Sequence, residues 1–440
     1  MTSPSPRVAV VGAGVAGLAA AIRLSEAGAE VSVHDPQFAA GGLAGGFEVE
    51  GTSVERFYHH LFRSDVIAAD WIRSLGLGPR LEFLSATQGF FSGGHLYPFG
   101  TPASLLRFGA MRFTDRVRLG LRLRQISTTP SSAPFERISA MDWLRVRSSP
   151  GELRVFWEPL LNAKFGPDRD LVSMAWLWAR FRARVGGSIG ASERLGYLRG
   201  GFQQLSDALA DRARLLGADV RLSSRVVGVD IEAGRVTALR TEAGADKVDA
   251  VVWTPSLRAL AKLVPELPEA YRAKCEGIRY HHAVVMVVEL SKSALPFYWV
   301  TVGDPDLPFT VAVEHTRLVP ASDYGGRTLV YLGRYAPPED PILAESDDAI
   351  RDRFLEAASR AFSETFNAPL GTHVFRAPAA QPIVPPGWAT DCPPLRAPVT
   401  GLITANMAQI YPWDRGINYS LELGERAAAE TLGALRDQVR

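Results

Sequence analysis

The chain has few of the residues that build disulfide frameworks and zinc sites. Only two cysteines occur among its 440 residues, Cys275 and Cys392, and they lie far apart with no metal-ligand spacing. We therefore expect neither a disulfide-stabilised scaffold nor a structural zinc, and we predict no metal site.

Long apolar runs and an excess of one charge are missing as well. No run of about 20 apolar residues occurs, so we expect no transmembrane helix. The opening Met-Thr-Ser-Pro-Ser-Pro carries no basic residue, and glycines interrupt the apolar stretch that follows, which argues against a signal peptide. The formal net charge of +1 gives no general attraction to nucleic acid. We expect a cytoplasmic protein without a nucleic-acid partner; nothing in the sequence indicates its oligomeric state.

Lysine is also scarce, with five lysines against 43 arginines, a bias that we attribute to the genome. The remaining composition is that of a globular protein, because 47% of the residues are hydrophobic and 22% are charged. At roughly 100 to 200 residues per domain, the length predicts two or three domains with a sizeable core.

The first fifty residues carry the most informative pattern. Val8–Val11 is a short apolar run, typical of a strand buried in a parallel sheet, and it is followed by Gly12-Ala-Gly14-Val-Ala-Gly17. An apolar helix is predicted next, and then a second strand over Glu30–His34 that ends at Asp35. Strand, glycine turn, helix, strand and acid in this order predict a dinucleotide-binding unit.

Each glycine of this turn has a physical task. Gly12 allows the tight turn, Gly14 lets the backbone approach a pyrophosphate, and Gly17 lets the helix pack closely on the strand. The phosphates then meet the free N–H groups and the positive dipole end of the helix. Asp35 can accept hydrogen bonds from the hydroxyls of an unphosphorylated ribose.

A second glycine cluster, Gly41-Gly42-Leu-Ala-Gly45-Gly46, follows Asp35 and would let backbone approach the same pyrophosphate from the other side. With it the sequence resembles the FAD-dependent amine oxidase superfamily, which includes protoporphyrinogen oxidase, phytoene desaturase and UDP-galactopyranose mutase. The resemblance implies FAD as the cofactor. Leu43 departs from the arginine that many members carry, so a phosphate contact made by that arginine must be absent or replaced. The predicted cofactor-binding residues of this region are Gly12, Gly14, Val15, Ala16, Gly17, Asp35, Pro36, Gly41, Gly42 and Leu43.

A segment in the middle of the chain extends the resemblance. Gly200-Gly201 precedes an amphipathic helix, and strand-like stretches follow between Asp219 and Pro255. The resemblance implies a return to the cofactor domain, with Val226 or Val227 against the adenine and Thr254 in the same site. A generic unit of helix, strand and hairpin is the alternative.

The C-terminal segment extends it further. Gly401–Asn406 indicates a buried strand, and Tyr411–Asn418 leads into a helix. The resemblance implies that this helix points its N-terminus at the flavin, where backbone N–H groups near Ile417 and Asn418 would stabilise negative charge. Asn406 stands near the place where the family usually has an acid, and it could hydrogen-bond the ribityl chain or a phosphate without carrying a charge.

The predicted fold is α/β: a Rossmann-like doubly wound FAD-binding domain with a second α+β substrate domain of mixed sheet and helices. Helices are predicted over Pro150–Arg184, strands between Tyr280 and Tyr335, and a capped surface helix over Ser346–Phe366. The predicted bounds are 1–85, 195–260 and 395–440 for the discontinuous FAD domain, and 86–194 and 261–394 for the substrate domain.

The flavin itself performs hydride chemistry, so a side-chain base is not required, and the catalytic candidates are few. His59 and His60 lie among aromatic residues and could act near neutral pH, or they could be a buried structural pair. Lys164 could hold an anionic substrate group, and Glu314 is a further candidate; for both, a purely structural or solvated side chain is the alternative. Tyr411 and Trp413 precede the last helix, where the resemblance places them beside the flavin.

Leu105–Arg124 interleaves six arginines with apolar residues and predicts a basic amphipathic helix. Such a helix can make peripheral contact with an anionic membrane surface, or it can be a solvated face over the core. The sequence leaves both interpretations open.

The resemblance implies an FAD-dependent oxidoreductase, whether oxidase, dehydrogenase or desaturase. It would remove a hydride from a C–N or C–C site of a moderately apolar or glycan-linked small molecule. The main alternative is a redox-neutral sugar isomerase that uses reduced FAD, because Phe57–Phe62 and Leu96–Phe99 resemble the UDP-galactopyranose mutase branch as much as the oxidases. A flavin-holding binding protein without turnover is the third possibility.

Overall fold

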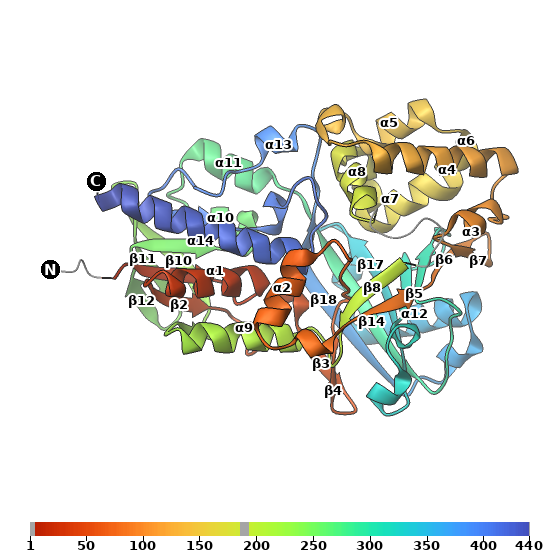
Figure 1. The fold of residues 1–440 in the computed structure, drawn as a ribbon, viewed down its shortest axis with the longest axis horizontal. Coiled ribbons are helices and arrows are strands. Elements are labelled where there is room, and N and C mark those ends of the chain that lie inside the picture. Colours follow the sequence, from red (N-terminus) through yellow and green to blue (C-terminus); the bar gives the residue numbers. More distant parts are fainter. Residues whose placement is uncertain (1–4, 185–192, 440) are drawn as a thin grey trace.

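A computed structural model describes residues 5–184 and 193–439 of the chain (Figure 1). Its first sheet is parallel, has the strand order β19-β13-β1-β2-β9, and takes its strands from distant parts of the sequence. The five strands are β1 (Arg7–Val11), β2 (Glu30–His34), β9 (Asp219–Arg221), β13 (Ala250–Trp253) and β19 (Leu402–Thr404). Because β1 is central, its apolar run is paired on both edges, with Val10 opposite Val33 and Val252.

The two faces of this sheet are covered differently. Val8 and Val10 belong to the core beneath α1 (Val15–Glu26), α9 (Gln203–Leu215) and α14 (Ile417–Val439). Ala9 and Val11 point into a second core, with residues of α10 (Leu257–Leu263), α11 (Glu269–Gly277) and the three-stranded antiparallel sheet β10-β11-β12. The strands of that small sheet are β10 (Val226–Glu232), β11 (Arg235–Thr241) and β12 (Gly244–Lys247).

The strand, turn and helix predicted at the start of the chain are confirmed. β2 spans Glu30–His34 as expected, and eight of the twelve residues of α1 are buried, which suits its run of alanines and leucines. The helix ends at Glu26, Ala27 is its C-cap, and Gly28 follows with a φ of +85°, the left-handed conformation that glycine adopts without strain.

The second large sheet is mixed and has the strand order β18-β14-β17-β16-β15-β6-β7, in which only the β15–β6 pair is parallel. One face packs on α12 (Asp347–Ala361), whose N-terminus is capped by Ser346 as predicted. The strands are β6 (Gln88–Ser92), β7 (His95–Phe99), β14 (Tyr280–Leu290), β15 (Trp299–Val302), β16 (Val311–Glu314), β17 (Thr328–Ala336) and β18 (Gly371–Pro382).

Helices gather above the other side of this sheet, at the upper right of Figure 1. They are α3 (Pro102–Leu106), α4 (Phe113–Thr128), α5 (Ala140–Arg147), α6 (Pro150–Glu152), α7 (Glu158–Phe165) and α8 (Met174–Arg182). The elements that join the two parts of the molecule are β3 (Gly46–Val49), β4 (Thr52–Glu55), α2 (Val66–Ser74), β5 (Leu81–Ala86) and β8 (Glu193–Leu198), and α13 (Trp388–Asp391) precedes β19.

The single helix predicted over Leu105–Arg124 is wrong. The chain breaks between α3 and α4, where Phe108 turns inward and is fully buried. Arg116 stabilises the break, since its guanidinium donates to the carbonyl oxygens of Leu106 and Met111 at 2.6 and 2.8 Å. Within residues 5–184 and 193–439, no helix is long and apolar enough to cross a membrane.

Candidate functional site

The turn after β1 uses its three glycines in different ways. Gly12 has a φ of +100°, and a Cβ atom there would clash with the Thr254 hydroxyl, which donates to the Val11 carbonyl at 2.8 Å. A Cβ on Gly17 would clash with the carbonyl oxygen of Gly12. A Cβ on Gly14 would meet nothing within 4 Å. Gly14 therefore borders open space at the N-terminus of α1, which is where a phosphate group would lie.

Asp35 stands at the end of β2 with a fixed orientation. Its side chain is only 8% exposed, and its two oxygens accept hydrogen bonds from the backbone N–H groups of Ala13 and Gln37, both at 2.8 Å. These bonds leave lone pairs on both oxygens for ribose hydroxyls. Pro36 is exposed beside it.

The second glycine turn faces the first. Gly41 and Gly42 both have positive φ values, +124° and +57°, and the Gly41 N–H donates to the Ala13 carbonyl at 2.9 Å. A Cβ on Gly42 would lie 3.4 Å from the Cα atom of Gly14. Backbone from two turns thus borders one space, as expected for a pyrophosphate held from both sides.

Arg56 supplies a cation at this turn that sequence reasoning missed. Its guanidinium donates to the carbonyl oxygens of Gly42 at 3.0 Å and Gly45 at 3.3 Å. Leu43, where the resemblance leads us to expect arginine, is half-buried and lines a small pocket. Arg56 follows Glu55 at the end of β4, so no spacing rule of the glycine motif points to it. These residues fit a dinucleotide cofactor.

The other predicted cofactor residues differ in their surroundings. Val226 is half-buried on β10, whereas Val227 is 39% exposed, so the two side chains have different access to a ligand. Asn406 is buried, and both side-chain atoms are engaged within the protein: Oδ1 accepts from Tyr280 and Ala408, and Nδ2 donates to the Pro255 carbonyl at 2.9 Å. Asn406 therefore holds its own loop together.

A cavity of about 200 Å³ lies between the mixed sheet and the helices above it. Trp299, Thr301 and Val311 form its floor, α7 and α8 form its roof, and the segment Tyr58–Phe62 closes one side. Ile417 and Asn418, the first residues of α14, also border it. We refer to this space as the large cavity.

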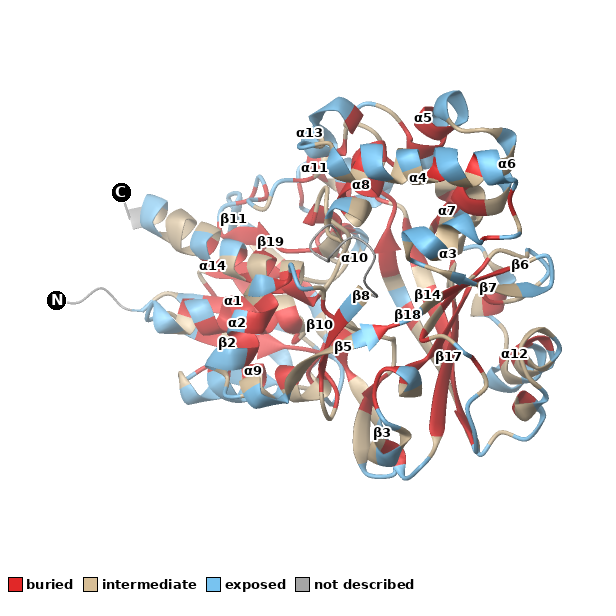
Figure 2. Ribbon diagram, turned by 45° about the vertical axis from the view of Figure 1, so that its right-hand side comes forward, coloured by how far each residue is buried: buried red, intermediate tan, exposed pale blue. Residues whose placement is uncertain are grey.

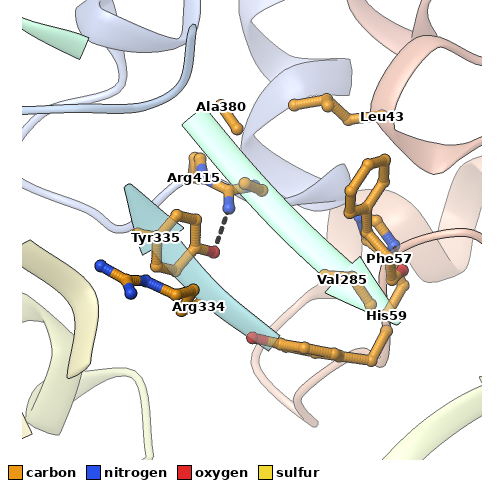
Figure 3. Close-up of a pocket in the computed structure, with 10 residues that line it drawn as sticks. Leu43, Phe57, His59, Val285, Arg334, Tyr335, Ala380 and Arg415 are labelled. Carbon is orange, nitrogen blue, oxygen red and sulfur yellow. Dashed lines mark hydrogen bonds between the residues drawn. The ribbon is translucent and has the colours of Figure 1, made fainter. Parts of the chain in front are cut away.

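A smaller pocket of about 40 Å³ adjoins the large cavity and shares five lining residues with it, Tyr58, His59, Arg334, Tyr335 and Arg415. Figure 3 shows this small pocket, with the guanidinium of Arg415 directed at the hydroxyl of Tyr335. Leu43, beside the second glycine turn, lies at the opposite side of the pocket from Tyr335. The small pocket thus leads from the glycine turns toward the large cavity.

Three of the predicted catalytic residues line the large cavity: His59, His60 and Lys164. Burial lowers the pKa of His59 to about 4 and that of His60 to about 3, and nearby arginine charges act in the same direction. Both imidazoles are therefore neutral at pH 7 and can act there as hydrogen-bond partners, not as cations.

The other three predicted catalytic residues have structural partners. Glu314 is buried and ties down a loop by accepting from the N–H groups of Ala294 and Leu295 at 2.9 and 2.6 Å. The Tyr411 hydroxyl donates to Glu136 at 2.6 Å, and the Trp413 ring stacks on Tyr419 at 5.5 Å between centroids. Of these residues, only Tyr419 lines the large cavity.

Positive charge gathers in the large cavity, which the sequence did not indicate. Besides Lys164, its lining contains Arg180, Arg184, Arg334 and Arg415, against the carboxylates of Asp65 and Asp414. With 43 arginines in the chain, no single one stands out by its position in the sequence. Lys164 does stand out in the sequence, because it is one of only five lysines.

Comparison with known proteins agrees with this geometry. Residues 15–432 match the family described as flavin containing amine oxidoreductase. The chain is 28% identical over 304 residues to a probable zeta-carotene desaturase from Synechococcus elongatus, covering 60% of this chain and 61% of that protein. It is 28% identical over 299 residues to a phytoene dehydrogenase from Streptomyces griseus, covering 60% and 57%. The chain thus spans about 60% of the length of these two relatives.

The fold is shared with a solved structure as well. A crystal structure of a putative protoporphyrinogen oxidase from Exiguobacterium superposes with a TM-score of 0.76 and covers 98% of this chain and 99% of that one, at 18% sequence identity. At this identity the likeness establishes the fold, and function has to be argued from the site.

Proposed function

Because the chain belongs to the flavin containing amine oxidoreductase family and is an FAD-dependent oxidoreductase, we propose that it oxidises a small molecule held in the large cavity. The reaction we propose removes a hydride from a carbon next to nitrogen, or desaturates a carbon–carbon bond. FAD bound at the glycine turns would supply the hydride acceptor, the proton lost in the same oxidation would pass to solvent, and the protein would supply position and electrostatic field.

One observation carries this proposal: α14 connects the glycine turns to the large cavity. A Cβ on Gly424 would clash with the carbonyl oxygen of Ala16, so α14 packs directly on the first turn of α1. Seven residues earlier, Ile417 borders the large cavity. At 1.5 Å of rise per residue this separation is about 10 Å, short enough for one extended cofactor to reach from the phosphate turn to the cavity.

The chain's own residues then have distinct tasks. Gly12, Gly14 and the facing turn at Gly42 would hold the pyrophosphate, with Arg56 adding a positive charge, and Asp35 would hold the ribose. The N-terminus of α14 would stabilise negative charge on the reduced ring.

Residues of α7 and α8 cover one side of the large cavity. The neutral His59 and His60 can orient a substrate through hydrogen bonds without contributing charge.

Anaerobic flavin spectroscopy tests the proposal. Purified FAD-loaded protein would be mixed with phytoene, zeta-carotene, protoporphyrinogen or putrescine without added reductant, and the flavin absorbance near 450 nm recorded. Bleaching by any of these supports hydride removal. Turnover of UDP-galactopyranose that appears only after reduction with dithionite would instead support the redox-neutral isomerase. A spectrum that no substrate, reductant or acceptor changes would indicate a binding protein.

We also propose peripheral contact with an anionic membrane through α4 and the end of α3. Phe113, Val117 and Leu121 repeat every four residues on α4, and Phe113 and Leu121 are each 63% exposed. Exposed arginines flank them, and the one acid of the helix, Asp115, is buried. The outward side of α4 appears as an exposed face in Figure 2. An apolar stripe with cationic borders suits the boundary between lipid headgroups and acyl chains.

Sedimentation with vesicles tests this contact. Protein should pellet with phosphatidylglycerol vesicles and remain free with phosphatidylcholine vesicles, and the double change Phe113→Ser and Leu121→Ser should abolish pelleting. Equal pelleting of the variant would contradict the proposal.

A further inference from the structure

Three cations lie around one carboxylate in the large cavity, and two of them bond to it. Lys164 on α7 and Arg180 on α8 both bond to the same oxygen of Asp414, with the Arg180 guanidinium 3.3 Å away. Arg415 is the next residue after Asp414 and donates to neutral partners, the Gln381 amide oxygen at 3.0 Å and the Tyr335 hydroxyl. In the described part of the chain, Arg415 forms no ion pair. We refer to Lys164, Arg180, Asp414 and Arg415 as the cationic cluster.

The other two arginines of the large cavity are already compensated. Arg184 pairs with Glu193 at 3.5 Å, and Arg334 pairs with Asp340; both acids lie outside the lining. Asp65, the second acid of the lining, is a weak counterion, because burial raises its pKa to about 6. The positive charge without a counterion is thus concentrated in the cationic cluster.

Burial makes this excess of positive charge energetically unfavourable. Desolvation and the charges of Arg180 and Arg415 together lower the pKa of Lys164 to about 7, against the opposing charge of Asp414. The same cations hold the pKa of Asp414 down to about 2, so its carboxylate remains ionised. Because Lys164 is about half protonated at pH 7, the cluster carries roughly one to two positive charges beyond the one that Asp414 neutralises.

One aromatic ring supports two cations of the cationic cluster. Lys164 and Arg180 have aromatic support, since both approach the Trp176 ring, at 5.1 and 5.8 Å from its centroid. Packing of this kind holds long cationic side chains in place before a ligand arrives.

We infer that the large cavity binds a substrate through a group with two negative charges, a phosphate ester or a pair of carboxylates, held by Lys164, Arg180 and Arg415. This inference rests on the proposed function, because it names the substrate class of the same site. Arginine and lysine around a doubly charged anion form charge-assisted hydrogen bonds, and the anion neutralises the cluster. A hydrocarbon would leave the cations unpaired, and a diamine would be repelled by them.

Binding measurements on the oxidised, FAD-loaded protein test this inference without requiring turnover. Phenyl phosphate and glutarate serve as the two dianionic probes, and putrescine serves as the cationic comparison, in calorimetric titrations with the visible flavin spectrum recorded alongside. We expect saturable binding of at least one anion and none of putrescine. Tighter binding of phenyl phosphate indicates a phosphate ester, and tighter binding of glutarate indicates a dicarboxylate.

Three substitutions distinguish the contribution of the cationic cluster to anion binding from that of nearby charges. Arg180→Gln should weaken anion binding at least about tenfold, as expected for the loss of one charge-assisted bond. Arg182→Gln is the matched control, because Arg182 lies on the same helix but is exposed outside the cavity, and its anion affinity should stay unchanged. Asp414→Asn should have the opposite effect and tighten anion binding, since it removes the one competing anion.

Several results would overturn the inference: no anion binding, equal affinities for Arg180→Gln and Arg182→Gln, or weaker binding by Asp414→Asn. Variants that change only the flavin spectrum or FAD content would show that the cluster serves the cofactor. FAD content and melting temperature identify a misfolded variant, and Lys164→Met then replaces Arg180→Gln. Bleaching by a neutral substrate without anion binding refutes the inference alone, whereas anion binding without any bleaching refutes the proposed oxidation alone.

Discussion

The glycine turns after β1 and the large cavity beneath α7 and α8 are built from different parts of the polypeptide. At the turns, the chain uses backbone atoms and empty space, and Gly14 contributes by having no side chain. At the large cavity, it uses long side chains that converge from α7, α8 and the start of α14. Changes at the first site should therefore act through added atoms, and changes at the second through removed charge. The following predictions test this difference, from the largest expected effect to the smallest.

The largest effect is expected for Gly17→Ala, because the new methyl group would clash with the backbone oxygen of Gly12, which cannot move away. We expect a loss of at least about 3 kcal/mol in the free energy of unfolding, measured by urea denaturation. Gly14→Ala is the control, since its methyl group enters open space and should leave stability unchanged. Similar stabilities of the two variants would contradict this account of the turn.

A large loss of cofactor without loss of fold is expected for Gly14→Phe. The ring would occupy the space in which the pyrophosphate approaches the helix N-terminus, so FAD affinity should fall at least about 100-fold. The measurements are FAD content after gel filtration and the far-UV circular dichroism spectrum. Stoichiometric yellow protein would refute the assignment of this turn to FAD.

Smaller losses are expected where a single side chain contacts the cofactor. Asp35→Asn removes the charged acceptor for the ribose, and Arg56→Gln removes the cation at the second glycine turn; each should weaken FAD about tenfold. Arg73→Gln serves as control, because Arg73 is exposed on α2 and pairs with Asp70, away from the glycine turns. Titration of apoprotein with FAD, followed by flavin fluorescence, gives the dissociation constants. An unchanged dissociation constant for Arg56→Gln would show that Arg56 does not replace the phosphate contact that Leu43 cannot make.

The smallest effect is expected at Glu55, which lies between the two regions and accepts hydrogen bonds from the Phe202 N–H and the Tyr197 hydroxyl. Burial raises the pKa of Glu55 to about 7. The folded state therefore binds this proton more tightly than the unfolded chain, and the associated stability is present below pH 4.5 and is lost as the pH rises to about 7. In Glu55→Gln, the change in melting temperature over this pH range should be smaller by a few degrees. An identical slope in both proteins would show that Glu55 titrates normally.

The same contrast explains what the sequence could predict. The strands β1 and β2, the helix α1 and the cap at Ser346 follow from local patterns, and the structure confirms them. Asp35 was identified because its spacing from Gly12 is a property of one strand–helix–strand unit. The break at Phe108 was missed because the side chain of Arg116, which bonds back to the preceding turn, stabilises it.

The charge of the large cavity was missed for a related reason. Arg180, Asp414 and Arg415 come together only through tertiary packing, and each is ordinary in its own sequence context. Asn406 shows what a family position leaves undetermined: its side chain forms hydrogen bonds within the protein, and its contact with the cofactor stays a prediction. Whether His59, His60 and Lys164 act in the reaction stays a prediction.

The order of strands in the parallel sheet has a consequence for synthesis of the chain. β1 emerges from the ribosome first, yet its neighbour β13 and the outer strand β19 come from residues 250–253 and 402–404, and the covering helix α14 comes after them. β1 and α1 are therefore synthesised long before the strands and the helix that pack against them. The parallel sheet is therefore begun first and completed last, and until then the apolar faces of β1 and α1 are exposed to aggregation.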